Sequence, residues 1–168
     1  MSFKEIKAED LQFNPFTRIG SDWMLITAGD EKKFTAMTAS WGGSGVFWGK
    51  NVVTCYIRPQ RYTKEFVDAN DTFTLSFYGP ECKNALNLCG TVSGRDRDKI
   101  SEAGLTPYFT EGTAAFEEAN LIFVCRKIYQ DDMPYENFIA KENDAKYYPN
   151  KDYHTMYIAE IVKILVAE

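Results

Sequence analysis

Residues 37–63 read MTASWGGSGVFWGKNVVTCYIRPQRYT, and the prediction of the fold rests on this stretch. The run KFTAMTAS at 33–40 overlaps the start of this stretch, and its side chains alternate in character along the chain. It ends in small hydroxyl and methyl side chains, which predicts a strand whose end lies against a flat ligand. The glycines of WGGSG let the backbone approach a neighbour closely or adopt positive φ angles, so we expect a loop there. Residues 51–58, NVVTCYIR, are β-branched and apolar and predict a second strand.

A cationic group follows this second strand. Arg58 and Arg61 precede a helical pattern at 64–70, and Thr63 is the predicted N-cap of that helix. Two guanidinium groups beside a helix N-terminus favour the binding of a phosphate dianion. The alternative is an ordinary turn with two surface arginines. The order of the parts, with Trp41 beside the hydroxyl-lined strand end, favours a pocket for a flat aromatic phosphoester.

The combination MTASWGGSG, VFWGK and YIRPQRYT resembles the flavin reductase-like family, which includes flavoredoxin-like flavoproteins. The resemblance continues in NALNLCGTVSGRDRDK at 84–99 and YHTMYIAEIV at 153–162. It implies a mainly β fold, the FMN-binding split β-barrel, which is an antiparallel Greek-key barrel with short helices. It also implies bound FMN and a homodimer.

Composition limits the classes of protein to which the chain could belong. A length of 168 residues predicts one domain, 1–168, with a substantial core. Aromatic side chains make up 15% of the residues, which favours β-structure with ring-lined pockets. The net charge of −5 argues against a nucleic-acid partner. Because no apolar run is long enough to span a membrane and the first residues are not typical of a signal peptide, we expect a cytoplasmic protein without a membrane partner.

The remaining elements follow from hydrophobic periodicity. The predicted strands are 23–28, paired with 33–40 as a hairpin, then 51–58, a half-buried 71–78, 119–130 and 153–166. The predicted helices are 64–70, a short one from Pro80 that ends just before Gly90, and 96–105. Residues 131–151 are polar and aromatic and are expected to form a loop or short helix over a site mouth. Strands at irregular spacing with short helices between them favour a closed or partly closed antiparallel barrel.

The four cysteines lack the spacing of a metal or disulfide motif. Cys55 and Cys125 lie in strand-like runs and are expected to be inert core residues. Cys82 and Cys89 are seven residues apart on a predicted helix and so share a face. A redox or metal pair there remains an alternative. Against it stand the near absence of histidine and a helix C-terminus that gives a thiolate no stabilisation.

The resemblance implies roles for individual residues. A bound flavin needs its phosphate neutralised, hydrogen bonds to the polar edge of its ring, and one open ring face. The residues that match the family at the ring edge are Thr38, Ala39, Ser40 and Trp41. Those that match at the phosphate are Arg58, Tyr62 and Thr63. Arg61 is expected to bind the phosphate with them, and Lys83, Ser93 and Arg95 are further candidates.

His154 is the only histidine, and it matches a position near the flavin in the family. Its near-neutral pKa does not by itself make it catalytic, because hydride transfer to a flavin needs positioning more than a protein base. Catalytic residues are therefore not assigned. Since neighbours on a strand point to opposite faces, at most one of Tyr153 and His154 should line the pocket.

Three functions fit these residues. The first is an oxidoreductase in which NADH or NADPH reduces FMN, which then passes electrons to free flavin, ferric iron or a partner protein. The second is an FMN electron carrier without a nicotinamide site of its own. The third is a relative that binds another phosphate-bearing heterocycle, against which the intact arginine group argues. No GxGxxG motif follows a predicted strand, so a Rossmann nicotinamide site is not expected.

The last predicted strand also bears on assembly. In YIAEIVKILV, 157–166, strict alternation places Tyr157 and Ile161 on one face and Ile158, Val162 and Ile164 on the other. An outer face that apolar predicts a homodimer, with residues 131–154 of one chain covering the flavin of the other. The alternative is that short helices of the same chain cover this face.

Overall fold

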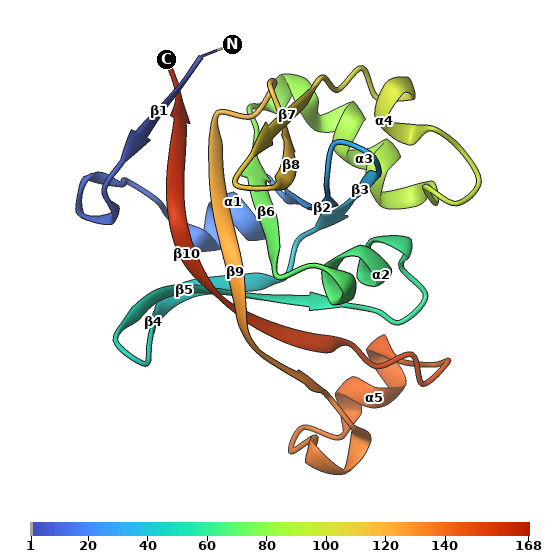
Figure 1. The fold of residues 1–168 in the computed structure, drawn as a ribbon. Helices are drawn as coiled ribbons and strands as arrows, with labels where there is room; N and C mark the ends of the chain where they lie inside the picture. Colours follow the sequence, from blue (N-terminus) through green and yellow to red (C-terminus); the bar gives the residue numbers. More distant parts are fainter. Residues whose placement is uncertain (1) are drawn as a thin grey trace.

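The computed structural model describes residues 2–168 and shows a mainly antiparallel β architecture with short helices around it (Figure 1). One sheet has the strand order β3-β2-β6-β9-β10-β5-β4, with β1 paired to β10. Its strands are β1 (Phe3–Ile6), β2 (Met24–Gly29), β3 (Phe34–Ala39), β4 (Gly42–Phe47), β5 (Lys50–Ile57), β6 (Thr72–Phe77), β9 (Leu121–Asp132) and β10 (Thr155–Ala167). A separate hairpin joins β7 (Pro107–Thr110) to β8 (Thr113–Phe116).

The helices are short and lie at the margins of the sheet. They are α1 (Pro15–Gly20), α2 (Tyr62–Ala69), α3 (Lys83–Thr91), α4 (Lys99–Glu102) and α5 (Glu142–Tyr147), with single 3-10 turns at Ala8–Asp10, Pro80–Cys82 and Tyr135–Asn137. None of the helices in the described part of the chain combines the length and apolar character that a membrane crossing requires.

The predicted hairpin at 23–40 is confirmed as β2 and β3, paired from Met24↔Ala39 to Gly29↔Phe34. The glycine-rich stretch that follows is not the expected loop. Residues 42–47 form β4, which pairs with β5, and the turn between them has positive φ at Trp48 and Gly49. A Cβ at Gly42 would lie 2.7 Å from the Thr54 carbonyl oxygen, so close backbone approach is the reason for glycine there.

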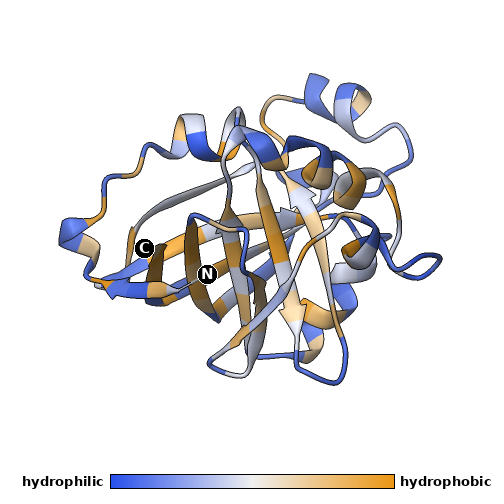
Figure 2. Cartoon of the chain, turned by 90° about the horizontal axis from the view of Figure 1, so that it is seen from above, coloured by the Kyte–Doolittle hydropathy of each residue, from blue (hydrophilic) through white to orange (hydrophobic). Residues whose placement is uncertain are grey.

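Hydrophobic residues are concentrated along the strands (Figure 2). One core cluster contains Phe73, Phe77 and Phe123, and a second contains Leu25, Leu86 and Ile122, among others. The second cluster includes residues of α3 and of β8, and Figure 1 shows α3, α4, β7 and β8 on the same side of the molecule.

Strand β6 is therefore buried on both faces, and the prediction of a half-buried strand is wrong. Thr74 and Ser76 are fully buried, and the Thr74 hydroxyl donates to the Ala114 carbonyl at 2.7 Å. The cause is the β7–β8 hairpin, which the sequence pattern did not predict. It covers the polar face of β6.

The predicted boundaries of three helices are wrong. Arg61, not Thr63, occupies the N-cap position of α2, and Thr63 is a buried residue of the first turn. Helix α3 continues through Gly90 to Thr91 instead of ending before the glycine. Gly90 is placed there by packing, since an added Cβ would lie 3.2 Å from Cβ of Thr38 on β3. Helix α4 is also shorter than the predicted 96–105.

Strands β9 and β10 are the longest in the sheet and pair along nearly their whole length. Ile128 of β9 and Val162 of β10 are extra residues at two register shifts. An extra residue changes the phase of alternation, so Ile164 is buried with Tyr157 in the first core cluster while Val162 is exposed. The prediction that Ile164 faces outward is therefore wrong.

Candidate functional site

Three adjoining cavities lie around the end of β3. The apolar cleft, of about 540 Å³, is lined by Pro15, Phe16, Ile19, Gly20, Ser40, Trp41, Gly42, Gly43, Ser44, Tyr56 and Met133. The central cavity, of about 190 Å³, is lined by Met37, Thr38, Ala39, Ser40, Trp41, Tyr56, Arg58, Arg61 and His154. The cationic pocket, of about 120 Å³, is lined by Gln60, Arg61, Tyr62, Thr63, Gly90, Thr91, Val92, Ser93 and Lys99. Shared lining residues connect each cavity to the next.

The central cavity brings together the four residues predicted for the ring edge. Thr38 and Ala39 are still paired with β2, and β3 ends at Ala39, so Ser40 and Trp41 lie beyond that pairing. The Thr38 hydroxyl donates to the Leu86 carbonyl at 2.5 Å, so this side chain anchors α3 to β3. Ala39 and Ser40 are then the better candidates for contacts with a ligand.

The cationic pocket contains a buried ammonium group. Lys99 is 3% exposed, and its Nζ donates to the carbonyls of Cys89 at 2.9 Å and Val92 at 3.0 Å. Arg61 donates to the Gly90 carbonyl at 2.9 Å. Burial, with the nearby positive charge of Arg61, lowers the pKa of Lys99 to about 8.

In the described part of the chain, these two cations are without an acidic partner. Within residues 2–168, no carboxylate forms an ion pair with Lys99 or Arg61. A buried charge without a counter-ion is costly, and proteins normally pair it. The pocket also lies at the first turn of α2, where backbone N–H groups are free to bind an anion. The arrangement is that of an anion site.

Arg58 lies elsewhere than predicted. It lines the central cavity and not the cationic pocket, and its guanidinium forms an ion pair with Asp152 at 2.9 Å. It also donates to the Tyr147 carbonyl at 2.9 Å. Arg58 thus ties the segment 133–153 to the cavity, and its charge is already neutralised. Arg61 and Lys99, which line the cationic pocket, are then the better candidates for contacts with an anion.

Two further candidates lie outside the three cavities. The Nζ of Lys83 donates to the Ser21 carbonyl at 2.8 Å and lies over the Trp23 ring. Arg95 forms an ion pair with Glu65 and lies over the ring of Tyr62. Neither side chain lines the cationic pocket, although Arg95 donates at 3.2 Å to the carbonyl of Gln60, which does line it. Ser93, Tyr62 and Thr63 do line that pocket.

His154 lines the central cavity, and Tyr153 does not. The Tyr153 hydroxyl donates to Asp144 at 2.6 Å instead. His154 Nδ1 lies 2.7 Å from the Tyr148 hydroxyl, and its ring centroid is 5.4 Å from that of Trp41. Burial, with the positive charge of Arg58, lowers the pKa of His154 to about 4, so the imidazole is neutral at physiological pH.

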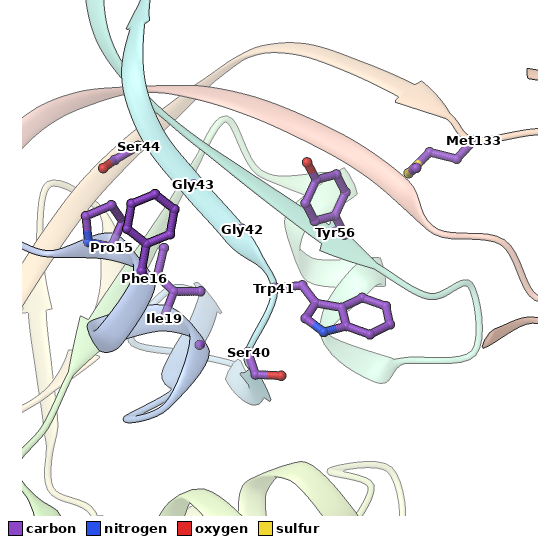
Figure 3. Close-up of a pocket in the computed structure, with 11 residues that line it drawn as sticks. Pro15, Phe16, Ile19, Ser40, Trp41, Gly42, Gly43, Ser44, Tyr56 and Met133 are labelled. Atoms are coloured by element: carbon purple, nitrogen blue, oxygen red, sulfur yellow. The ribbon is translucent and has the colours of Figure 1, made fainter. Parts of the chain in front are cut away.

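The apolar cleft has no charged residue in its lining. Figure 3 shows Phe16 and Ile19 of α1 on one side of the β4 backbone and Trp41 and Tyr56 on the other. Such a lining suits an uncharged planar group. Residues 131–151, predicted as a loop or short helix, begin with the last two residues of β9 and include α5. They border the cleft through Met133, and the Tyr147 ring lies 5.4 Å from that of Trp41.

Sequence reasoning missed α1, Tyr56 and Lys99 as parts of the site. Tyr56 had a usable signal, because alternation with the buried Cys55 and Ile57 directs it to the other face of β5. Lys99 had no usable sequence signal, since a lysine in a run such as SGRDRDK is typical of a solvated helix start.

The thiols take no part in these cavities. Burial raises the pKa values of Cys82 and Cys89, so both thiols are held in the protonated form. Across residues 2–168, no group of three or more histidine, cysteine or acidic side chains is arranged to hold a metal ion.

The family model described as "Flavin reductase like domain" matches residues 16–168. No curated protein sequence matches the chain. Among solved structures, flavoredoxin from Methanosarcina acetivorans is similar at a TM-score of 0.70 and 19% identity, covering 96% of this chain and 77% of that one. Flavoredoxin of Desulfovibrio vulgaris (Miyazaki F) has a TM-score of 0.67 and 21% identity over 87% and 69% of the two chains. An FMN-binding domain of a flavin reductases-like enzyme from Shewanella baltica OS155 has a TM-score of 0.69 and 14% identity over 98% and 77%.

Proposed function

Because this chain belongs to the flavin reductase-like family, we propose that it is an FMN-binding oxidoreductase that takes electrons from NADH or NADPH and passes them to an acceptor. The observation that carries the proposal is the cationic pocket, in which Lys99 and Arg61 form no ion pair with any carboxylate of residues 2–168. A phosphomonoester dianion supplies the missing charge and accepts several charge-assisted hydrogen bonds. FMN ends in such a group, whereas the two phosphates of FAD form an internal pyrophosphate with no terminal dianion.

The other two cavities fit the rest of the same molecule. Arg61 connects the cationic pocket to the central cavity, where Ala39 and Ser40 offer polar groups for the ring edge. Trp41 and Tyr56 connect that cavity to the apolar cleft. When bound, FMN supplies the capacity to accept a hydride and release electrons singly or in pairs. The protein residues bind the phosphate, orient the ring and shield one face from water.

The uncharged lining of the apolar cleft supports a nicotinamide donor. A nicotinamide ring is planar, and such a ring could lie in the cleft beside Trp41 without any Rossmann motif. Free flavin, ferric iron and a partner protein are the acceptors that we propose.

The second candidate is an FMN electron carrier with no nicotinamide reaction. It is favoured by the similarity to two flavoredoxins, which is a similarity of fold. Anaerobic titration of the flavin-loaded protein separates the two. Bleaching of the flavin absorbance by stoichiometric NADH or NADPH supports the oxidoreductase. Bleaching by dithionite alone supports the carrier.

Acid release and chromatography of the bound flavin tests the cofactor itself. We expect FMN, and recovery of mainly FAD would contradict the phosphate assignment. A purified protein that takes up neither flavin would contradict the proposal as a whole.

We also propose a homodimer, now on a different surface. Val46, Phe47 and Trp48 at the tip of the β4–β5 hairpin are exposed together with Tyr129, whose ring centroid is 6.4 Å from that of Trp48. We call these four residues the hairpin patch. An exposed apolar cluster of this kind favours association. Segment 133–153 packs on the cavity of its own chain, so we do not retain the idea that it covers the partner's flavin.

A further inference from the structure

The hydrogen bond between Tyr148 and His154 joins segment 133–153 to the central cavity. Tyr148 Oη lies 2.7 Å from His154 Nδ1. Both residues are 6% exposed, so solvent does not compete for the bond. Tyr148 follows the last residue of α5, and His154 directly precedes β10. His154 lines the central cavity and Tyr148 does not. The bond therefore fixes the side chain of His154 through a residue that lies outside the cavity.

The direction of this bond follows from the available partners. Within residues 2–168, the Tyr148 hydroxyl has no hydrogen-bonding partner other than His154. A buried hydroxyl proton without an acceptor costs free energy, so the hydroxyl donates and Nδ1 accepts. A neutral imidazole that accepts at Nδ1 carries its proton on Nε2.

The second nitrogen is left without a protein partner among the described residues, in a ring that lines the central cavity. In the described chain, Nε2 of His154 makes no hydrogen bond to protein, and the ring borders the central cavity beside Trp41. Two charged groups act on this imidazole. The Arg58 guanidinium disfavours a second proton on the ring, and Asp152, which pairs with Arg58, opposes that effect in part.

Tyr148 is itself held rigidly. The Arg58 guanidinium carbon lies 4.9 Å from the centroid of the Tyr148 ring. The rings of Phe138 and Tyr153 pack around it, with centroids at 5.6 and 5.1 Å. Such packing leaves the hydroxyl in one place and makes its bond to His154 a fixed constraint.

We propose that Tyr148 is a positioning residue that holds His154 as the neutral tautomer protonated on Nε2. The Nε2–H group then donates to a carbonyl oxygen or ring nitrogen of the planar ligand in the central cavity. The identity of that ligand as FMN rests on the proposed function, but the tautomer does not. The role of Tyr148 can therefore be tested without flavin.

The test is nitrogen NMR of the flavin-free protein labelled with ¹⁵N-histidine. A single histidine gives only two ring nitrogen signals, so no assignment by mutation is needed. We expect one protonated nitrogen, Nε2, and one unprotonated nitrogen, Nδ1, near neutral pH. A mixture of tautomers, or a proton on Nδ1, in the wild-type protein would overturn the proposal, whatever the variants do.

Tyr148→Phe keeps the packed ring and removes only the hydroxyl. We expect its two nitrogen signals to move toward the tautomer average, whereas Tyr153→Phe, the matched control from the same aromatic group, leaves them unchanged. Unchanged signals in Tyr148→Phe would also overturn the proposal. Because wild type alone tests the tautomer, poor folding of a variant does not remove the test.

FMN titration then links the tautomer to the ligand. In the wild-type protein, we expect FMN binding to shift the Nε2 signal. We expect Tyr148→Phe to reduce the affinity for FMN by up to about tenfold, which is the effect of losing one neutral hydrogen bond. Failure of wild type to bind FMN would contradict the proposed function and leave the apo result intact. Binding of FMN with no change at Nε2 would contradict the contact with the ligand and leave the proposed function intact.

Discussion

Lys99 and Arg61 border the same small pocket, and each donates to backbone carbonyls at the C-terminal end of α3 instead of to a carboxylate. The carbonyls orient the two cations but do not neutralise them. An anion in this pocket would therefore gain two charged partners whose positions are already fixed. Four predictions follow from this pocket and its surroundings.

Lys99→Met should weaken FMN binding by roughly ten- to a hundred-fold, the effect of losing one charged hydrogen bond. Riboflavin lacks the phosphate, so its affinity should change little. Fluorescence titration of both flavins measures the two effects. Lys83→Met is the matched control, because Lys83 lies outside the cavities. Equal losses for FMN and riboflavin would argue against a phosphate contact at Lys99.

Arg61→Ala should impair FMN binding more than riboflavin binding, whereas Arg58→Ala should affect both flavins alike. The reason is that Arg58 pairs with Asp152 and holds segment 133–153, while Arg61 borders the cationic pocket. The ratio of FMN to riboflavin affinity, measured for each variant, is the quantity to compare. A selective loss of FMN in Arg58→Ala would restore Arg58 as the phosphate ligand.

FMN affinity should fall as the pH rises above about 8, where Lys99 loses its proton in the free protein. Arg61 and Cys89 also lie close to this ammonium group, and titration of neither is expected to make FMN affinity rise with pH. The free energy of unfolding of the free protein should change in the opposite direction and rise with pH. Because the folded pKa lies below the ordinary 10.5, the unfolded chain holds more protons between about 8 and 10.5, and this group makes stability rise with pH there. Calorimetric titration at several pH values, with Lys99→Met as control, checks the binding effect.

His154 should remain neutral from pH 7 down to about 5, since its pKa is about 4 instead of the ordinary 6.5. A depressed folded pKa means that the unfolded chain takes up the proton first. The contribution of His154 to stability is therefore complete above pH 6.5 and is lost as the pH falls toward 4. The proton NMR titration of the single imidazole measures the pKa directly, and a midpoint near 6.5 would contradict the buried, neutral state.

The hairpin patch yields a separate prediction about assembly. Trp48→Glu should shift the sedimentation equilibrium from dimer toward monomer, because it places a charge in the proposed contact. Ile139→Glu changes an apolar residue outside the patch that is even more exposed than Trp48, and it should leave the equilibrium unchanged. A wild-type protein that is monomeric at micromolar concentration would exclude the dimer.

The hairpin β2–β3 and strands β5, β9 and β10 could be predicted because their periodicity is local. Helix α1, β1 and the β7–β8 hairpin could not, since their stability comes from packing and pairing with distant strands. The glycines of β4 illustrate the same limit. Their sequence indicates close backbone approach or a loop equally well, and only the partner strand β5 decides between them.

The site was predictable where residues follow one another along the chain. Thr38 to Trp41 lie together because they are the end of one strand, and Arg61 to Thr63 because they begin one helix. Lys99 reaches the same pocket only through the fold of α3 and α4. The ion pair of Arg58 with Asp152 could not be predicted for the converse reason, since Asp152 is far away in sequence.

The extra residue Val162 has a consequence for changes in chain length. A deletion within a regular strand exchanges its two faces from that point onward. Val162 has no partner in the pairing of β10 with β9, and the inward-facing residues resume correctly on either side of it. Removal of Val162 would join two segments whose inward-facing side chains would then alternate without interruption. Position 162 is therefore a place where this strand can tolerate a single-residue deletion, and relatives one residue shorter here should still align on both sides.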